Sequence, residues 1–177
     1  MLIVVFMLIS VSVLPQAVTT EENVEYASKR KQRITVGLGH THLSNAQDTE
    51  GSKTWLLVPS WSMNYDYRVA KAWSVGLQTD LVLQEFVVEE SDNRELERDK
   101  PWSIVPVGIW KPFKHFSFVA GAGIELEKDR NLGLTGLGVE YGCELPKAWE
   151  AGVAVACDNK WGYYNSWGVA FLFSKTF

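Results

Sequence analysis

The residues most capable of chemistry lie close together near position 40. His40 and His42 are two positions apart, so both imidazoles project from the same face of an extended strand. Neutral imidazole nitrogens ligate metals, and two on one face can share a cation. A metal site would need a third ligand from the next segment, where Asp48 and Glu50 are candidates. We interpret His40 and His42 as rim residues, keep metal binding as the alternative, and expect no metal or other cofactor.

Ser44 follows His42 by two positions and introduces a possible nucleophile. A serine hydroxyl is activated when a histidine base lies within hydrogen-bond reach. The segment from His42 to Ala46 resembles the His-x-Ser-Asn-Ala motif of the lipid A deacylases, eight-stranded outer-membrane barrels in which the histidine, the serine and a glutamate act together. The match covers five residues of the first predicted hairpin, whereas the family's motif lies late in its barrel, and no acidic third member is clearly placed. We predict no catalytic centre, with a lipid-modifying hydrolase using His42 and Ser44 as the alternative.

Acidic residues form the largest chemically active set. They share one face of the predicted strands with two arginines, and the members of this lumen network are Asp66, Asp80, Glu125, Glu140, Glu144 and Glu150 with Arg33 and Arg68. Because the carboxylates outnumber the arginines, we expect some to be protonated, paired with lysines from the rims, or solvated by trapped water.

The elements that position these residues are strands, because apolar and polar residues alternate with a period of two from Arg33 onward. Two prolines, Pro59 and Pro106, remove ladder donors, and we attribute them to bulges or local breaks. The segment containing Pro106 is apolar on both faces. The eight predicted strands are 33–42, 54–67, 72–88, 102–111, 115–128, 132–145, 149–158 and 163–177.

Connections between the strands indicate an up-and-down meander. Segments 44–53 and 89–100 are long and polar, whereas 68–71, 111–114 and 146–148 are short. Segment 89–100 has nine charged residues in twelve and is predicted to be a solvated loop. The fold class is therefore all-β, an eight-stranded antiparallel up-and-down barrel.

The chain starts with an apolar stretch, 2–14, followed by Pro15 and a polar run. Thirteen residues are too few for a membrane helix, which needs about 20, but suit the core of a secretory signal peptide. We expect a signal peptide at 1–20, a short periplasmic segment at 21–32 and the barrel domain at 33–177. An exported barrel without another apolar span is either soluble or an outer-membrane protein.

Two patterns favour the membrane barrel with a polar lumen. The polar strand faces are rich in glycine, which suits a narrow interior better than a solvated exterior. The aromatic residues gather near strand ends, as in the two interfacial girdles of membrane barrels. One rim is predicted to hold Tyr65, Tyr67, Trp73, Trp110, Phe113, Phe116 and Trp149, and the other Trp55, Phe86, Trp102, Trp161 and Tyr163.

The last segment ends in Phe177, preceded by apolar residues at alternate positions from Trp167, with Lys175 as a departure. It resembles the C-terminal strand of bacterial outer-membrane barrels, and 33–177 resembles the small OmpA/OmpX/OmpW-like barrels in strand number and pattern. The resemblance implies that Phe177 is the signal read by the barrel-assembly machinery.

Charge and cysteine content exclude other classes. With 17 basic and 21 acidic side chains the chain has no basic footprint for nucleic acid. Cys143 and Cys157 are too few for a disulfide scaffold, and a tight turn between their strands would place Cys143 opposite Ala151. We predict a monomer in the outer membrane of a Gram-negative bacterium, in contact with lipid and lipopolysaccharide. Its role would be structural or in surface interaction, and a narrow cation- or proton-conducting channel is a further alternative.

Overall fold

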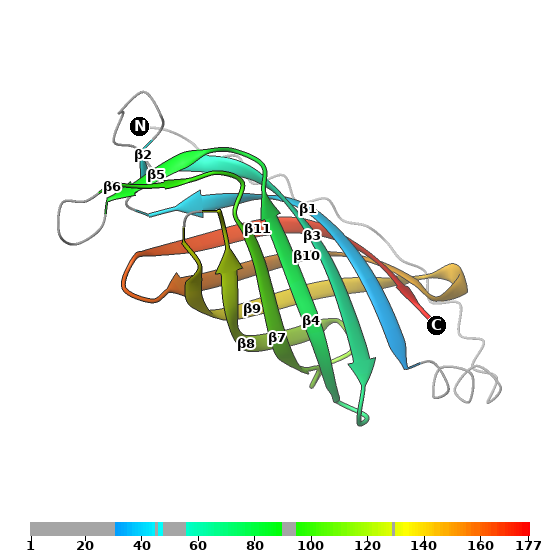
Figure 1. Ribbon diagram of the computed structural model, residues 1–177. Coiled ribbons are helices and arrows are strands. Elements are labelled where there is room, and N and C mark those ends of the chain that lie inside the picture. Colours follow the sequence, from blue (N-terminus) through cyan, green and yellow to red (C-terminus); the bar gives the residue numbers. More distant parts are fainter. Residues whose placement is uncertain (1–30, 45, 48–55, 90–94, 129) are drawn as a thin grey trace, which may run out of the picture.

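Eight antiparallel strands close into a barrel (Figure 1). The computed structural model describes residues 31–44, 46–47, 56–89, 95–128 and 130–177. The predicted signal peptide and Trp55 lie outside these ranges. The barrel strands are β1 (Gln32–Leu43), β3 (Leu56–Arg68), β4 (Trp73–Val82), β7 (Trp102–Trp110), β8 (Phe116–Leu126), β9 (Leu132–Leu145), β10 (Trp149–Lys160) and β11 (Tyr164–Thr176).

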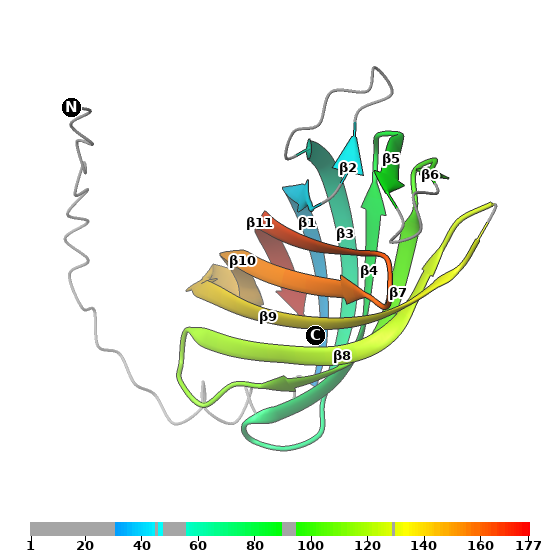
Figure 2. The same ribbon diagram turned by 90° about the vertical axis from the view of Figure 1, so that its left-hand side faces the viewer.

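Each barrel strand pairs with its neighbours along the chain, and β1 closes the cylinder by pairing with β11. This confirms the predicted up-and-down topology. One end, here called the tight-turn end, carries short connections such as the 3-10 turn η1 (Pro146–Ala148). The opposite end, here called the hairpin end, carries β2 (Ala46–Gln47), β5 (Phe86–Glu89) and β6 (Glu95–Arg98), which form a separate three-stranded sheet (Figures 1 and 2).

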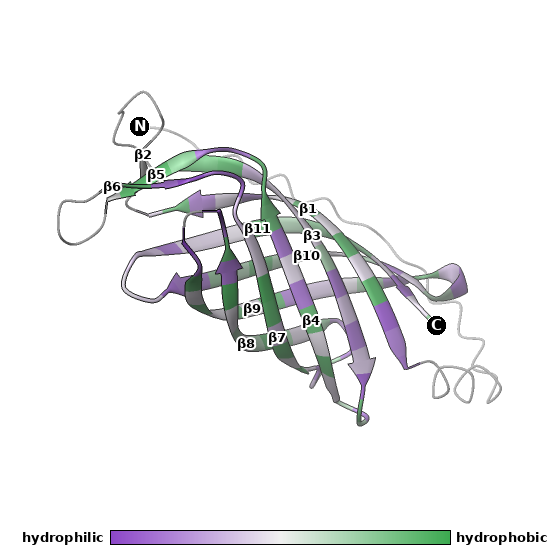
Figure 3. Cartoon of the chain, viewed as in Figure 1, coloured by the Kyte–Doolittle hydropathy of each residue, from purple (hydrophilic) through white to green (hydrophobic). Residues whose placement is uncertain are grey.

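The outer surface of the barrel is apolar. Along β1, Val36 is 47% exposed while its neighbour Thr35 is 1% exposed and faces the lumen. The same alternation recurs along β3, β8, β9 and β11, and Figure 3 shows it as alternating hydrophobic and hydrophilic bands on the ribbons. Strands of 9 to 14 residues reach across a bilayer when tilted. An apolar exterior around a partly polar interior is the arrangement of a transmembrane barrel.

Within the described ranges, no helix is both long enough and apolar enough to cross a bilayer.

The lumen is crowded, which explains the glycines on the inward face. A Cβ atom at Gly76 would collide with the Asp66 carboxyl and with the Tyr65 carbonyl oxygen. A larger residue at this position of β4 would therefore displace a carboxylate that takes part in the lumen network described below.

The two prolines disturb the sheet differently. Pro106 pairs with Leu77 of β4, but β7 and β8 pair only up to Ile104 and again from Val107, with unchanged register. It is thus a local break without a bulge. Pro59 pairs with β1 and lies just before the first β3–β4 pair, at Ser60, so its missing N–H disrupts no described ladder.

The hairpin end differs from the sequence prediction in three ways. The predicted strand 72–88 is two strands, because β4 ends at Val82 and β5 turns over the mouth of the barrel. The predicted solvated loop 89–100 contains β6, which pairs with β5, and the side chain of its Arg98 is buried. Phe86, predicted for the aromatic girdle, is 1% exposed because it packs in the apolar cluster that covers the mouth.

Candidate functional site

The lumen near the tight-turn end is crossed by a cluster of ion pairs around Arg33. The guanidinium donates to Asp66 through Nε (2.7 Å), to Glu140 through Nη2 (2.9 Å) and to Glu150 through Nη1 (3.4 Å). Lys111 lies 3.7 Å from Glu150. Four strands, β1, β3, β9 and β10, contribute the other side chains, and Lys111 follows directly after β7. The cluster therefore ties opposite walls of the barrel together.

A second cluster closes the lumen near the hairpin end. Arg98 of β6 reaches into the mouth and donates to Glu125 (2.5 Å), to Glu127 (3.2 Å) and to the carbonyl oxygen of Arg130 (2.6 Å). The Tyr164 hydroxyl lies 2.8 Å from both Glu125 carboxyl oxygens. The arginine side chain is fully buried, so its charge is compensated by these contacts and not by bulk water.

An apolar cap lies above this second cluster. Phe86 and Val88 of β5 pack against Leu43, Leu132 and Tyr164 of the barrel wall, with Val58 completing the buried set. The Phe86 and Tyr164 rings meet edge to face at 5.8 Å. The short hairpin-end sheet is therefore packed onto the mouth of the barrel by both apolar contacts and the Arg98 ion pairs.

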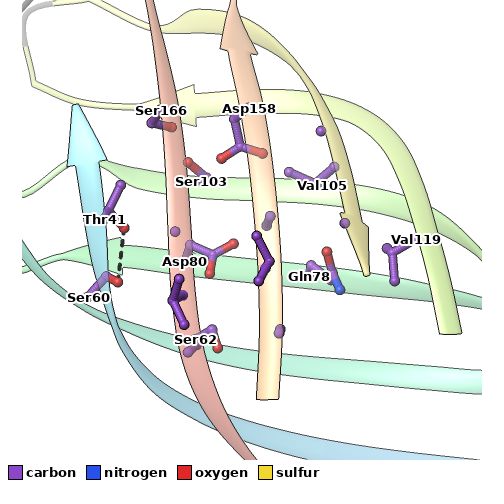
Figure 4. Close-up of a pocket in the computed structure, with 18 of the residues that line it drawn as sticks. Thr41, Ser60, Ser62, Gln78, Asp80, Ser103, Val105, Val119, Asp158 and Ser166 are labelled. Atoms are coloured by element: carbon purple, nitrogen blue, oxygen red, sulfur yellow. Dashed lines mark hydrogen bonds between the residues drawn. The ribbon is translucent and has the colours of Figure 1, made fainter. Parts of the chain in front are cut away.

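Between the two ion-pair clusters lies a cavity of about 110 Å³ (Figure 4). Asp80 and Asp158 both point into it, among hydroxyls from several strands. Asp158 accepts a hydrogen bond from Lys160 (3.1 Å), which also donates to Ser166 (2.6 Å). No hydrogen bond or ion pair from the described residues reaches the Asp80 carboxyl.

One side of the otherwise polar lumen is apolar. Val105, Val107 and Ile109 of β7 pack against Val119 and Leu134. This accounts for the apolar residues on both faces of the segment containing Pro106, because one face meets lipid and the other fills the lumen.

The sequence also predicts lumen positions for Arg68 and Glu144, but the structure places both at the exposed rim of the tight-turn end. The Glu144 side chain is 63% exposed and lies 3.7 Å from Lys114. Both residues have the inward parity of their strands, yet they lie beyond the part of the barrel that encloses the lumen. Asp66, Asp80, Glu125, Glu140 and Glu150 do lie inside.

His42 and Ser44 are not joined to each other by any hydrogen bond in the described part of the chain. The His42 ring stacks on Trp167 with 3.9 Å between centroids, and the Ser44 hydroxyl donates to the Asn165 carbonyl oxygen (2.7 Å). No group of three potential metal ligands occurs among the described residues, and Asp48 and Glu50 lie outside them. The geometry described here brings together neither the hydrolase pair nor a histidine metal site.

The C-terminal residues lie at the outer surface of the tight-turn end. Phe177 is 58% exposed, and its backbone N–H donates to the Gln32 carbonyl oxygen (2.8 Å) across the seam between β1 and β11. Lys175, which departs from the apolar pattern, holds its ammonium 4.5 Å from the centre of the Trp149 ring. A lysine in this position covers an aromatic residue and keeps its charge near the interface.

The two cysteines are exposed on the outer face and unpaired. Cys143 pairs with Ala151 and Cys157 with Leu137 in the β9–β10 ladder, so their sulfurs are well separated.

Sequence reasoning missed Arg98, Lys160 and Tyr164 as members of the lumen network. Arg98 was hidden in the highly charged segment 89–100, where nothing distinguishes a buried charge from solvated ones. For Lys160 and Tyr164 the strand parity was available as a signal, since both continue the inward rows of β10 and β11.

Comparison of the sequence with models of known protein families gave no match, and comparison with curated proteins gave none either.

Solved structures do resemble this barrel. A crystal structure of Ail, the attachment invasion locus protein of Yersinia pestis, in complex with the heparin analogue sucrose octasulfate, has a TM-score of 0.52 and 14% identity, covering 82% of this chain and 98% of that one. A second crystal structure of Ail has a TM-score of 0.51 and 12% identity with the same coverage. A structure of Ail in a phospholipid bilayer nanodisc, named there as an outer membrane protein, scores 0.48 at 10% identity and covers 83% of this chain and 100% of that one.

The likeness to the two crystal structures concerns the fold alone. It agrees with the closed eight-stranded barrel and with the predicted resemblance to small bacterial outer-membrane barrels.

Proposed function

We propose that this chain is an exported outer-membrane protein of a Gram-negative bacterium with a structural or surface-interaction role and no catalytic centre. The observation that carries the proposal is the combination of a lipid-compatible exterior with a lumen crossed by side-chain contacts near both ends. Ion pairs around Arg33 cross one end, and Arg98 with the apolar cap crosses the other. A barrel filled in this way is suited to holding segments at the membrane surface, because loops carry recognition and strands position them.

The hairpin end is the surface offered to the outside in this proposal. The N-terminus of β1 and the assembly signal Phe177 would then lie at the periplasmic side. Ail, which shares the fold, was crystallised with a heparin analogue. Segment 89–100 of this chain has six acidic and three basic side chains, so it would repel a sulfated polymer. We infer that its partner presents a neutral or basic surface.

Membrane integration is tested by fractionation combined with gel mobility. The protein should be found in the outer-membrane fraction and should migrate faster without heating than after boiling, because a closed barrel resists detergent. Recovery in the soluble periplasmic fraction would contradict the proposal.

Orientation is tested by trypsin on intact cells. Arg94 lies between β5 and β6, whereas Arg98 is buried and Lys100 precedes Pro101, a bond that trypsin does not cut. If trypsin cleaves the protein on intact cells, and the cleavage is lost in an Arg94→Gln variant, the hairpin end lies outside the cell. Cleavage only after lysis would reverse the orientation.

The two alternatives make different predictions. A conducting lumen predicts discrete currents in planar bilayers that change when Glu125 or Glu140 is neutralised, whereas the closed lumen predicts none. A lipid-modifying hydrolase predicts altered lipid A in cells that overexpress the protein, and no alteration with Ser44→Ala.

A further inference from the structure

The middle of the lumen contains a carboxyl group that has no hydrogen bond or ion pair with any residue the structure describes. Asp80 of β4 faces inward, with Ser62 of β3 paired on one side and Ser103 of β7 on the other. In the described part of the chain, the carboxylates Asp66, Glu125, Glu140, Glu150 and Asp158 each have a hydrogen bond or an ion pair. Asp80 has neither, although it lines an interior cavity.

The cationic side chain that lines this cavity is already engaged. Lys160 donates to Asp158 and Ser166 and lies 3.9 Å from Glu125. At the tight-turn end, Arg33 and Lys111 contact the carboxylates of Asp66, Glu140 and Glu150. Negative charge therefore exceeds positive charge in this cluster as well. The charge of Asp80 is therefore not balanced by these neighbours.

Neutral oxygen donors surround the Asp80 carboxyl. The hydroxyls of Ser62 and Ser103 and the amide of Gln78 line the same cavity. Asn64, which pairs with Gln78 in the ladder, is 7% exposed, and its Oδ1 accepts no hydrogen bond. Carboxylate, hydroxyl and amide oxygens are the ligands that hard cations prefer.

We propose that this cavity binds one alkali-metal cation, sodium or potassium, with the Asp80 carboxylate as its charged ligand. An isolated carboxylate in a low-dielectric interior is unstable and must take up either a proton or a cation. Among the described residues no hydrogen-bond donor or acceptor contacts the Asp80 carboxyl, and the unfolding experiment below separates a bound cation from a bound proton. Oxygens that line one cavity without bonding each other leave room for an ion that contacts several of them.

The charge of the site selects a monovalent ion. The other carboxylates that line the cavity, Asp158, Glu125 and Glu140, each contact a cationic side chain, whereas Asp80 contacts none among the described residues. Sites for multivalent ions usually combine several acidic ligands, and the described residues contain no such group of three. The Asn64 amide offers the ion a further ligand. Its Oδ1 has no hydrogen-bond partner among the described residues, and rotation of the amide would direct this oxygen toward the ion.

Thallium(I), a heavy substitute for potassium, tests the site directly. Crystals of the wild-type barrel soaked in a thallium(I) salt should show an anomalous peak beside the Asp80 carboxyl. The peak should disappear in Asp80→Asn and persist in Glu144→Gln, a control at the exposed rim. No peak in the wild-type protein, or a peak that persists in Asp80→Asn, would overturn the proposal.

Thermal unfolding in detergent micelles provides a second readout. A cation that binds only the folded barrel should raise the midpoint temperature as its concentration rises. Sodium or potassium chloride should therefore raise it more than N-methylglucamine chloride at equal ionic strength. The difference should vanish in Asp80→Asn and remain in Glu144→Gln. Equal midpoints for wild-type protein in small and large cations would mean that Asp80 carries a proton, and would overturn the proposal.

Discussion

Replacing Arg98 by methionine should release the hairpin-end sheet from the mouth of the barrel. Methionine keeps the length and much of the apolar contact of the arginine stem but removes its charge. The change leaves Glu125 and Glu127, both nearly fully buried, without the guanidinium that contacts them. It also removes the donor to the Arg130 carbonyl oxygen.

The expected cost follows from the burial of this group. Removing one partner of a buried ion pair typically costs about 3–5 kcal/mol, because an uncompensated charge stays behind. Glu125 keeps the Tyr164 hydroxyl at 2.8 Å and Lys160 at 3.9 Å, which places the expected loss near the lower limit. A loss of about 3 kcal/mol corresponds to about a 100-fold increase in the population of the undocked sheet.

Hydrogen exchange of the backbone amides in β5 and β6 measures that population. The exchange rate in Arg98→Met should rise about 100-fold while amides in β9 and β10 keep their protection. Lys100→Met is the matched control, because its exposed pairs with Asp99 (3.5 Å) and Glu85 (3.9 Å) should contribute less than about 1 kcal/mol. If Arg98→Met and Lys100→Met exchanged at the same rate, the proposed role of Arg98 in docking the sheet would be refuted.

Three further predictions concern the wall of the barrel and its other cluster. Arg33→Met should lower the free energy of unfolding by about 3–5 kcal/mol, because three lumen carboxylates lose their shared partner. Equilibrium unfolding in urea measures this loss. An unchanged unfolding midpoint would contradict the prediction. Val139 lies on the outer face in the middle of β9, and Val139→Arg should lower the free energy of unfolding in lipid vesicles by about 2–4 kcal/mol. Leu145→Arg, near the interface, should lower it by at most about 1 kcal/mol. Equal losses would argue against a bilayer centred on this strand. Oxidation with copper phenanthroline should not join Cys143 to Cys157 within one chain, because the β9–β10 ladder separates them. A faster-migrating monomer band that disappears on reduction would show that the β9–β10 register is wrong.

The barrel could be predicted from the sequence because its signal is strictly local. Alternation of apolar and polar residues fixes which face of each strand meets lipid, and short turns force neighbouring strands to pair. The predicted strand 132–145 coincides with β9, and Cys143 lies opposite Ala151 as a tight turn requires. Pattern alone cannot say where a strand leaves the barrel, so the end of β4 and the start of β5 were merged.

The candidate site was less predictable, because a charge pattern does not reveal burial. Arg98 lies among eight other charged residues in segment 89–100, yet it is the one whose side chain enters the lumen. Parity selected Asp66 and Glu140 correctly as inward residues, but it also selected Glu144, which lies past the rim. Depth along the barrel axis depends on tilt and on where each strand ends, and neither is written in the alternation.

The direction of the apolar face is tested most directly by a spin-label scan along β9. Single cysteines at positions 136 to 141 in a Cys143→Ser/Cys157→Ser background would each carry a nitroxide in lipid vesicles. Labels at Leu137, Val139 and Tyr141 should collide with oxygen dissolved in lipid, while labels at Gly136, Gly138 and Glu140 should be shielded from it. Accessibility with the opposite phase, or with no period of two, would contradict the account of a transmembrane barrel.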